Sequence, residues 1–380
     1  MSSLDSSREY IRFRPGVFPS FPASGQIELR TGPLGPPLIR LLLPEGEDWV
    51  SPIFRRLDGS RPIPELLDAI PESRRADARK LLSVLVAKRW AETGDAPFKA
   101  EDPVKDHLLA FRSFSNEDAE RTLRKTRLLV LGAGRLGSRI AGNLTMTGFR
   151  QLTLLDPSPV SFQDRTASPL LLQAEPGTPR ANALASALRE MAPDAAVQAV
   201  TEADGRTLER EMAEHDLTIV AEDCFHPRLL SDVNRLAVRL GKRWSMVLVN
   251  GWNLHVGPTI FPGQSGCLLC LHLETGETWV PENAPEEPAA DSGEPTRSLE
   301  SGFPSLVWPP HADVAAGLLA TDMLHAAGIM PRRIEPGTGM TLGRQLVFDL
   351  KSGQAFWRTV PRRPDCPVCG PGALSHPHEY

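Results

Sequence analysis

The chain has 380 residues, of which 41% are hydrophobic and 23% are charged, and its formal net charge is −5. This composition is typical of a globular protein with room for two domains, and the negative charge argues against nucleic acid as the main partner. The sequence has no apolar run of about 18 residues, which a membrane span would need, and no signal-peptide pattern after Met1. We therefore expect a cytoplasmic protein with no membrane partner.

Residues 1–95 are expected to fold as a small α+β domain. Short strands between proline and glycine turns are predicted over Tyr10–Phe13, Gln26–Arg30 and Leu38–Leu43. Helices are predicted over Trp49–Leu57, Ile63–Ile70 and Arg75–Trp90. Three strands followed by three helices indicate a winged-helix-like domain. The simpler alternative is a structural cap on the larger domain.

The central segment of the chain is Arg127–Asp156, which follows a polar linker over residues 96–121. An apolar strand, Leu128–Leu131, leads into a turn and a helix, and a second strand ends at Asp156. The turn contains three glycines, Gly132, Gly134 and Gly137. The first would allow a tight turn, the second the approach of a phosphate, and the third the packing of helix on strand. Asp156 is placed to hold a ribose hydroxyl, so this segment predicts a Rossmann-like unit.

The remainder of the chain extends this unit into an α/β domain over residues 122–380. Strands and helices alternate between Arg180 and Val249, which predicts a mostly parallel sheet with helices on both faces. A closing hairpin is predicted over Gln345–Leu350 and Gln354–Thr359. Residues 281–304 are rich in proline and acidic side chains, which is typical of a flexible loop.

Four of the five cysteines form two C-x-x-C pairs, at Cys267, Cys270, Cys366 and Cys369. Two such pairs supply the four soft ligands of a tetrahedral zinc ion, and a site filled by four protein ligands is structural rather than catalytic. A redox role is the alternative, but it would need only one pair beside a helix N-terminus. We therefore expect a structural zinc ion that ties the C-terminal segment to an earlier loop.

The N-terminal residues resemble the PqqD-type peptide-recognition element of enzymes that modify ribosomally made peptides. The resemblance lies in F-R-R-L-D-G-S-R-P-I-P-E-L-L, which begins at Phe54, and in L-L-S-V-L-V-A-K-R-W, which ends at Trp90. It implies that a leader peptide adds as a strand to an edge of the sheet and packs on the third helix. The positions implied are Leu38, Ile39, Arg40, Leu41 and Leu42 on the strand, and Lys80 and Lys88 on the helix.

The glycine turn, the two C-x-x-C pairs and the loop between them resemble the ThiF/MoeB superfamily, relatives of the ubiquitin-activating enzymes, over about Thr122–Gly370. Members bind ATP–Mg and adenylate the C-terminal carboxylate of a protein or peptide. V-A-E-D-C makes Asp223 the counterpart of the magnesium-binding catalytic aspartate. G-T-P-R makes Arg180 the counterpart of the lysine that contacts phosphate.

The sequence also departs from this superfamily's pattern. Arg135 replaces one glycine of the phosphate turn, and Ala167 stands where a phosphate-binding arginine is expected, with Arg165 as the candidate to replace it. The thioester-forming cysteine of many members is missing between Leu271 and Asp365. Because adenylation depends on positive groups aimed at the transferring phosphates, we expect a degenerate catalytic site. ATP–Mg is therefore disfavoured as a cofactor, and whether any ATP binding survives is left open.

A peptide-recognition element joined to a degenerate ThiF-like domain resembles the ocin-ThiF-like proteins of antibiotic biosynthesis. The resemblance implies a scaffold that binds a precursor's leader and presents its core to a separate YcaO-type cyclodehydratase, which forms azolines or thiazoles. One alternative is an active adenylating enzyme that acts on a peptide C-terminus through Asp223, Arg180 and either Arg135 or Arg165. A nicotinamide-dependent oxidoreductase is disfavoured because no catalytic set has recognisable spacing. Homodimer formation is left open.

Overall fold

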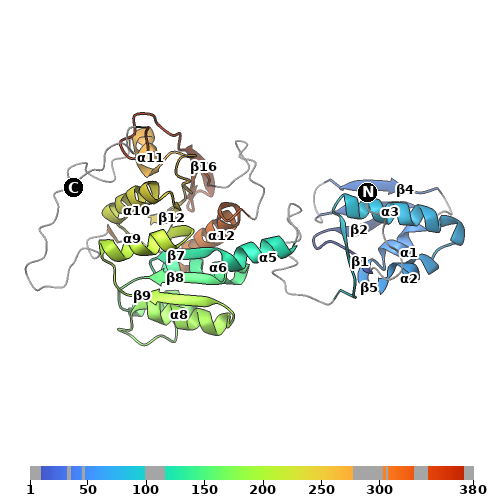
Figure 1. Cartoon of the computed structure of the whole chain (residues 1–380), viewed down its shortest axis with the longest axis horizontal. Helices are drawn as coiled ribbons and strands as arrows, with labels where there is room; N and C mark the ends of the chain where they lie inside the picture. Colours follow the sequence, from blue (N-terminus) through green and yellow to red (C-terminus); the bar gives the residue numbers. More distant parts are fainter. Residues whose placement is uncertain are drawn as a thin grey trace, which may run out of the picture. The chain divides into compact units, whose positions relative to one another are not determined.

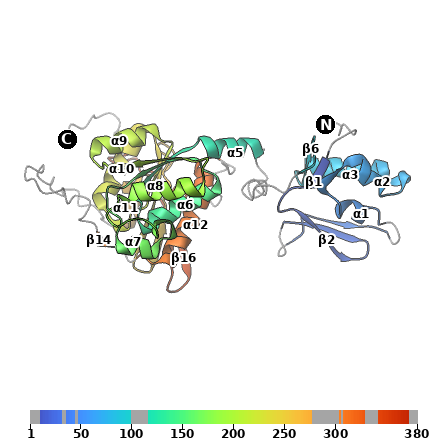
Figure 2. The same ribbon diagram turned by 90° about the horizontal axis from the view of Figure 1, so that it is seen from below.

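The computed structural model describes residues 10–31, 36–44, 48–98, 116–276, 303–304, 307–328 and 341–371. The chain divides into two compact units, Met1–Glu120 and Arg121–Tyr380 (Figures 1 and 2). Most of the loop expected over residues 281–304 lies outside the described residues, as do residues 99–115 of the expected linker. In the part of the chain that the structure describes, no helix is long and apolar enough to cross a membrane.

The N-terminal unit contains two three-stranded antiparallel sheets and a set of short helices. The first sheet has the strand order β5-β1-β6, with β1 at Tyr10–Phe13, β5 at Asp58–Pro62 and β6 at Ala91–Gly94. The second has the order β2-β3-β4, with β2 at Phe18–Ala23, β3 at Gln26–Arg30 and β4 at Ile39–Leu42. The helices are α1 at Val50–Phe54, α2 at Ile63–Asp68, the 3₁₀ turn η1 at Glu72–Arg74 and α3 at Arg75–Ala87.

One apolar core joins these sheets and helices. Ile11 of β1, Ile27 of β3 and Leu82 and Leu85 of α3 are at most 1% exposed and belong to the same cluster. Burial of about 25 cal/mol per Å² of apolar surface makes such a cluster the main stabilising contribution to a small α+β unit. The α+β character predicted for this part of the chain is therefore confirmed.

The unit has three strands more than the sequence predicted. β2 contains Pro19 and Pro22, which argue against a strand, but β2 lies at a sheet edge, where prolines remove no essential hydrogen bond. β5 begins at Asp58, with three residues between it and the end of α1 at Phe54, whereas the sequence predicted a helix as far as Leu57. α3 stops at Ala87, three residues early, and Arg89 beyond it has a positive φ of 56°.

The C-terminal unit is built on one eight-stranded sheet with the order β16-β15-β13-β12-β10-β7-β8-β9. Five strands are parallel: β7 at Arg127–Leu131, β8 at Gln151–Leu155, β9 at Ala196–Val200, β10 at Leu217–Val220 and β12 at Arg243–Asn250. Three continue it antiparallel: β13 at Asn253–Val256, β15 at Arg344–Asp349 and β16 at Gln354–Thr359. The predicted Rossmann-like, mostly parallel sheet and its closing hairpin are confirmed, whereas β13 was not predicted.

Helices cover both faces of this sheet (Figures 1 and 2). α6 packs with α8 and α12, and α10 packs with α9 and α11. The bounds are α5 at Asn116–Lys125, α6 at Arg135–Thr147, α7 at Phe162–Ala167, the 3₁₀ turn η2 at Pro169–Leu171, α8 at Arg180–Met191, α9 at Gly205–Glu214, α10 at Pro227–Leu240, α11 at Leu268–Thr275 and α12 at Pro309–Ala326. Two short strands, β11 at Cys224–Phe225 and β14 at Phe303–Pro304, pair with each other.

The position of β7 explains why the functional turn lies where it does. Leu128 to Leu131 are at most 1% exposed, because β7 has strands on both sides and helices on both faces. The carboxyl ends of β7, β8 and β10 therefore meet at one edge of the sheet, where doubly wound α/β proteins bind their ligands.

Candidate functional site

The glycine turn after β7 has the tight geometry that its sequence predicted. Gly132 adopts a left-handed φ of 96°, which a side chain would strain. A Cβ atom on Gly137 would overlap the Gly132 carbonyl oxygen, so only glycine lets α6 start this close to β7. The turn leads into the N-terminus of α6, where the N–H groups of Arg135 and Leu136 carry the partial positive charge of a helix end.

Asp156, directly after β8, accepts hydrogen bonds that hold the glycine turn from one side. Its Oδ2 atom accepts the N–H of Ala133 at 2.8 Å, and its Oδ1 atom accepts the N–H of Ser158 at 2.8 Å. The residue is 3% exposed. Asp156 therefore ties β8 to the glycine turn, and the ribose contact expected for it stays a prediction.

Asp223 reaches the turn from the other side, just beyond the end of β10. Its Oδ2 atom accepts the N–H of Arg135 at 2.8 Å, and its Oδ1 atom accepts the N–H of Leu136 at 2.9 Å. The Arg135 side chain also donates from Nε to Oδ2 at 3.3 Å. Hydrogen bonds to a charged group contribute about 1.5–3 kcal/mol each. The carboxylate thus caps α6 at the position where a phosphate would be bound.

Arg180 lies at the same edge of the sheet, and its guanidinium group is already paired with carboxylates. Its Nε and Nη2 atoms donate to the two oxygens of Asp164, at 2.8 and 3.1 Å, and its Nη1 atom lies 3.8 Å from Asp156. Asp164 is 1% exposed and forms a capping box with Ser161 at the start of α7. The structure therefore brings Arg180 to the predicted site, with its charge compensated by two buried carboxylates.

Glu222 is a site residue that the sequence reasoning did not single out. Its carboxyl carbon lies 3.1 Å from where a Cβ on Gly132 would stand, so its side chain packs under the turn. Burial and the negative charges of Asp156 and Asp223 raise the pKa of Glu222 to about 8. The signal in the sequence was its place beside Asp223 at the end of a buried strand.

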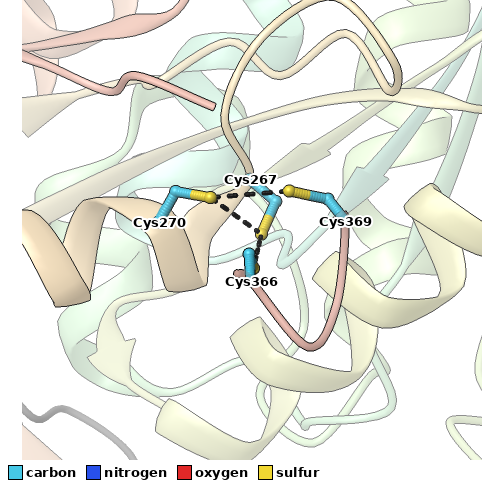
Figure 3. Close-up of side chains that lie close together, drawn as sticks. All are labelled: Cys267, Cys270, Cys366 and Cys369. Carbon is cyan, nitrogen blue, oxygen red and sulfur yellow. Dashed lines mark hydrogen bonds between the residues drawn. The ribbon is translucent and has the colours of Figure 1, made fainter. Parts of the chain in front are cut away.

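The four cysteines of the two C-x-x-C pairs lie together and are all buried (Figure 3). Cys267 precedes α11 and Cys270 lies in its first turn, whereas Cys366 and Cys369 lie on the tight turn after β16. That second turn closes with a 2.8 Å hydrogen bond from the N–H of Gly370 to the Cys366 carbonyl. Two segments far apart in sequence thus supply two sulfurs each.

The sulfur positions fit a tetrahedral metal ion. The Sγ–Sγ distances are 3.7 Å between Cys267 and Cys366 and 3.9 Å between Cys267 and Cys270. That between Cys270 and Cys369 is 3.4 Å. Four thiolates bound to one ion at about 2.3 Å would stand about 3.8 Å apart. The four residues can therefore hold one metal ion with no position left open.

In the N-terminal unit, β4 forms an edge of its sheet among the described strands. Leu43 donates its N–H to the Gly25 carbonyl, and Arg40 lies opposite Glu28. In this antiparallel register, the N–H groups of Arg40 and Leu42 point away from β3. The edge therefore offers the free backbone groups that an added strand needs.

The other residues predicted for peptide binding lie on β4, beside it, or on and just after α3. Leu38, Ile39 and Leu41 are half-buried against the core of the unit. Lys80 of α3 and Lys88, which caps the C-terminus of α3, are both exposed. The structure leaves all of these positions accessible in part, and their role in binding a peptide stays a prediction.

Comparison with known proteins gives the context of this arrangement. The family model described as "ThiF family" matches residues 105–368. The chain belongs to the ThiF family. Two curated relatives are Protein HesA from Leptolyngbya boryana, 26% identical over 258 residues (67% of this chain, 81% of that protein), and SAMP-activating enzyme E1 from Haloferax volcanii, 27% identical over 264 residues (68% and 85%).

Solved structures share the fold over nearly the whole chain. E. coli MccB with ATP has a TM-score of 0.64 at 17% identity and covers 95% of this chain and 100% of its own. The microcin C7 biosynthetic enzyme MccB in complex with N-formylated MccA has a TM-score of 0.65, also at 17% identity and the same coverage. PaaA has a TM-score of 0.64 at 14% identity and covers 91% and 98%.

Two arginines of this ThiF-family chain, Arg165 and Arg139, make contacts near the glycine turn that the sequence did not predict. Arg165 donates to the Leu172 carbonyl at 3.3 Å. Arg139 of α6, which the sequence reasoning missed, donates to the Ala167 carbonyl at 2.6 Å and pairs with Asp313. The signal that could have found Arg139 was its spacing of four residues from Arg135, which places both on one face of α6.

The cysteine cluster predicts that a metal ion stabilises the fold. Cys366→Ser or chelation should lower the melting temperature by at least about 5 °C, because metal binding to a closed site contributes directly to folding. Thermal unfolding and elemental analysis of the purified chain check this, with Cys224→Ser as the control outside the cluster. Metal-free protein of unchanged stability would contradict the metal site.

The raised pKa of Glu222 predicts a stability that falls as pH rises. The ordinary glutamate pKa is 4.5, so between that value and about 8 the folded chain keeps a proton that the unfolded chain has released. The free energy of unfolding should therefore decrease across this window and level off above it. Urea unfolding at pH 5 and pH 8.5 tests this: Glu222→Gln should lose less stability than wild type, and equal losses would count against the raised pKa.

Proposed function

We propose that the chain is a scaffold subunit that binds the leader of a ribosomal precursor peptide. It presents the peptide core to a separate YcaO-type cyclodehydratase that forms azoline or thiazole rings. The observation that carries this proposal is the occupied phosphate position. Asp223 accepts from the first amides of α6, and the cations Arg135 and Arg180 are paired with carboxylates.

This charge distribution favours a scaffold over an adenylating enzyme. Phosphoryl and nucleotidyl transfer need positive groups directed at developing negative charge. Here Arg180 is bound by Asp164, Arg139 pairs with Asp313, and Arg165 binds a backbone carbonyl. A subunit of this kind would act by raising the concentration of the peptide beside its partner enzyme.

The open edge of β4 supports the peptide-binding half of the proposal. Added strands gain affinity through backbone hydrogen bonds and selectivity through alternate side chains. The N–H groups of Arg40 and Leu42 are directed to that edge, while Lys80 on α3 and Lys88 at its C-terminal end add positive charge. The microcin C7 biosynthetic enzyme MccB, which shares the fold over 95% of this chain, has been solved in complex with N-formylated MccA.

An active adenylating enzyme is the second candidate. Two similar proteins favour it. SAMP-activating enzyme E1 is a sequence relative, and E. coli MccB, a structural neighbour, has been solved with ATP. In that case Asp223 would leave the α6 amides to bind magnesium, and Arg180 with Arg135 or Arg165 would contact phosphate. For the cysteine cluster we propose zinc, because four thiolates and no open position are typical of structural zinc sites.

Strand addition at β4 predicts a backbone-specific binding defect. Arg40→Pro removes an outward N–H group and should weaken leader binding by at least about tenfold. Arg40→Ala keeps that N–H group and should change affinity little. Isothermal titration of a candidate leader peptide against the full chain measures both.

The helix lysines provide a second arm of this experiment. Lys80→Glu and Lys88→Glu should weaken binding more mildly, and their effect should shrink as salt is added, because exposed charges are screened. Equal binding by the folded Arg40→Pro variant would show that the peptide is bound elsewhere. A loss in Arg40→Ala as large as in Arg40→Pro would show that the Arg40 side chain, and not its N–H group, carries the effect, which contradicts strand addition as its cause.

A further inference from the structure

We propose that a cavity at the amino ends of β10 and β12 binds a small organic dianion, a molecule with two negative charges on phosphate or carboxylate oxygens. The cavity has a volume of about 280 Å³, which is near the lower end of the range for small-molecule sites. It lies at the edge of the sheet opposite to the glycine turn, so it is separate from the candidate phosphate position. The site stands independently of which peptide or partner enzyme the chain serves.

Four elements form the walls of this cavity, and all of its lining residues belong to the C-terminal unit. The walls are the second half of α5, the first residues of β10 and β12, and the end of α12. β10 and β12 are neighbouring parallel strands, and Leu217 lies directly opposite Arg243 in their register. Leu217 and Ala326 are buried and supply apolar parts of the lining. A ligand with a carbon skeleton therefore finds apolar contacts here as well as charged ones.

Three basic side chains line the cavity. Arg121 and Lys125 are four residues apart on α5, which places them on one face of that helix. Lys125 makes no ion pair within the part of the chain that the structure describes. Arg243 of β12 is the third basic residue. Cations from two separate elements thus face one space, which favours a ligand with more than one negative charge.

Arg243 is held in place by contacts on two sides. Its Nη1 atom donates to the Ala326 carbonyl at 2.8 Å, and its guanidinium carbon lies 4.6 Å from the centre of the Phe261 ring. A planar guanidinium group that is already fixed loses little conformational freedom when it binds an oxyanion. Arg243 therefore supplies a fixed cation, whereas Arg121 and Lys125 are exposed side chains that can adjust to the ligand.

The carboxylate in the lining does not offset these charges, because Asp216 is bound by Arg127. Its Oδ2 atom accepts the N–H of Arg127 at 2.9 Å, and its Oδ1 atom accepts from Nη2 of the same arginine at 2.9 Å. The C-terminal ends of α5 and α12 also reach the cavity, and each is equivalent to about −0.5 of an elementary charge. Three lining cations against about one negative charge from the two helix ends leave an excess of about two positive charges. A dianion matches this excess, whereas a metal ion would be repelled by it.

Isothermal titration of the full chain with three probes tests this proposal. The probes are glutarate, which is a dicarboxylate, phenyl phosphate, which is a phosphate monoester, and butyrate, which is a monoanion. At least one dianion should bind at concentrations up to about 10 mM, and the tighter of the two shows which oxyanion the site prefers. Butyrate should bind at least about tenfold more weakly than that dianion, because it carries half of the charge.

Substitutions on α5 assign the binding to this cavity. Arg121→Ala and Lys125→Ala should each weaken binding of the preferred dianion at least about threefold, and the double variant at least about tenfold. These losses should shrink as salt is added, because exposed charges are screened. Arg124→Ala is the matched control, because Arg124 lies on the same helix but pairs with Asp194 and does not line the cavity. It should leave the affinity unchanged.

Four results would overturn the proposal. The first is that neither dianion binds the wild-type chain. The second is that the preferred dianion binds folded Arg121→Ala and Lys125→Ala as tightly as wild type, since its site would then lie elsewhere. The third is a loss in Arg124→Ala as large as in these two variants, since net charge alone would then explain the effect. The fourth is butyrate binding as tight as that of the preferred dianion.

Discussion

Two buried carboxylates hold the glycine turn from which the rest of the α/β unit is organised. Asp156 at the end of β8 and Asp223 beyond β10 each accept backbone N–H groups of the turn or of the first turn of α6. Because β7 lies between β8 and β10, these bonds join the carboxyl ends of three neighbouring strands. Unpaired amides at a buried helix end are costly, so removing either carboxylate would leave donors unsatisfied unless a ligand replaced it. The protein's own carboxylates therefore accept the N–H groups that a bound nucleotide would otherwise accept.

The second constraint on the fold is the cysteine cluster, which holds two segments of the C-terminal part of the chain together. It brings the turn after β16 to the start of α11, across 99 residues of sequence between Cys267 and Cys366. β16 forms the edge of the sheet next to β15, so the cluster also fixes where the antiparallel extension ends. The glycine turn and the cluster thus stabilise different parts of the sheet.

Local patterns allowed much of this fold to be predicted. β8 and β16 lie where their apolar or alternating segments placed them, and the glycines of the turn have the roles that their spacing indicated. β2 was missed because prolines argue against a strand unless the strand is known to be an edge. The bond between Asp223 and Arg135 joins residues 88 positions apart, and no local pattern encodes it. For the same reason the pairing of Arg180 with Asp164, rather than with an open site, became visible only in the structure.

A phosphate position occupied by Asp223 and an accessible strand edge support our proposal of a protein that binds a peptide without activating it. The most direct test is peptide-dependent exchange of labelled pyrophosphate into ATP by the full wild-type chain with Mg²⁺. A scaffold should catalyse no exchange above background at any concentration of precursor peptide, because adenylation never occurs. Exchange that requires the peptide and disappears in Asp223→Ala would show that the chain is an adenylating enzyme and would contradict this account.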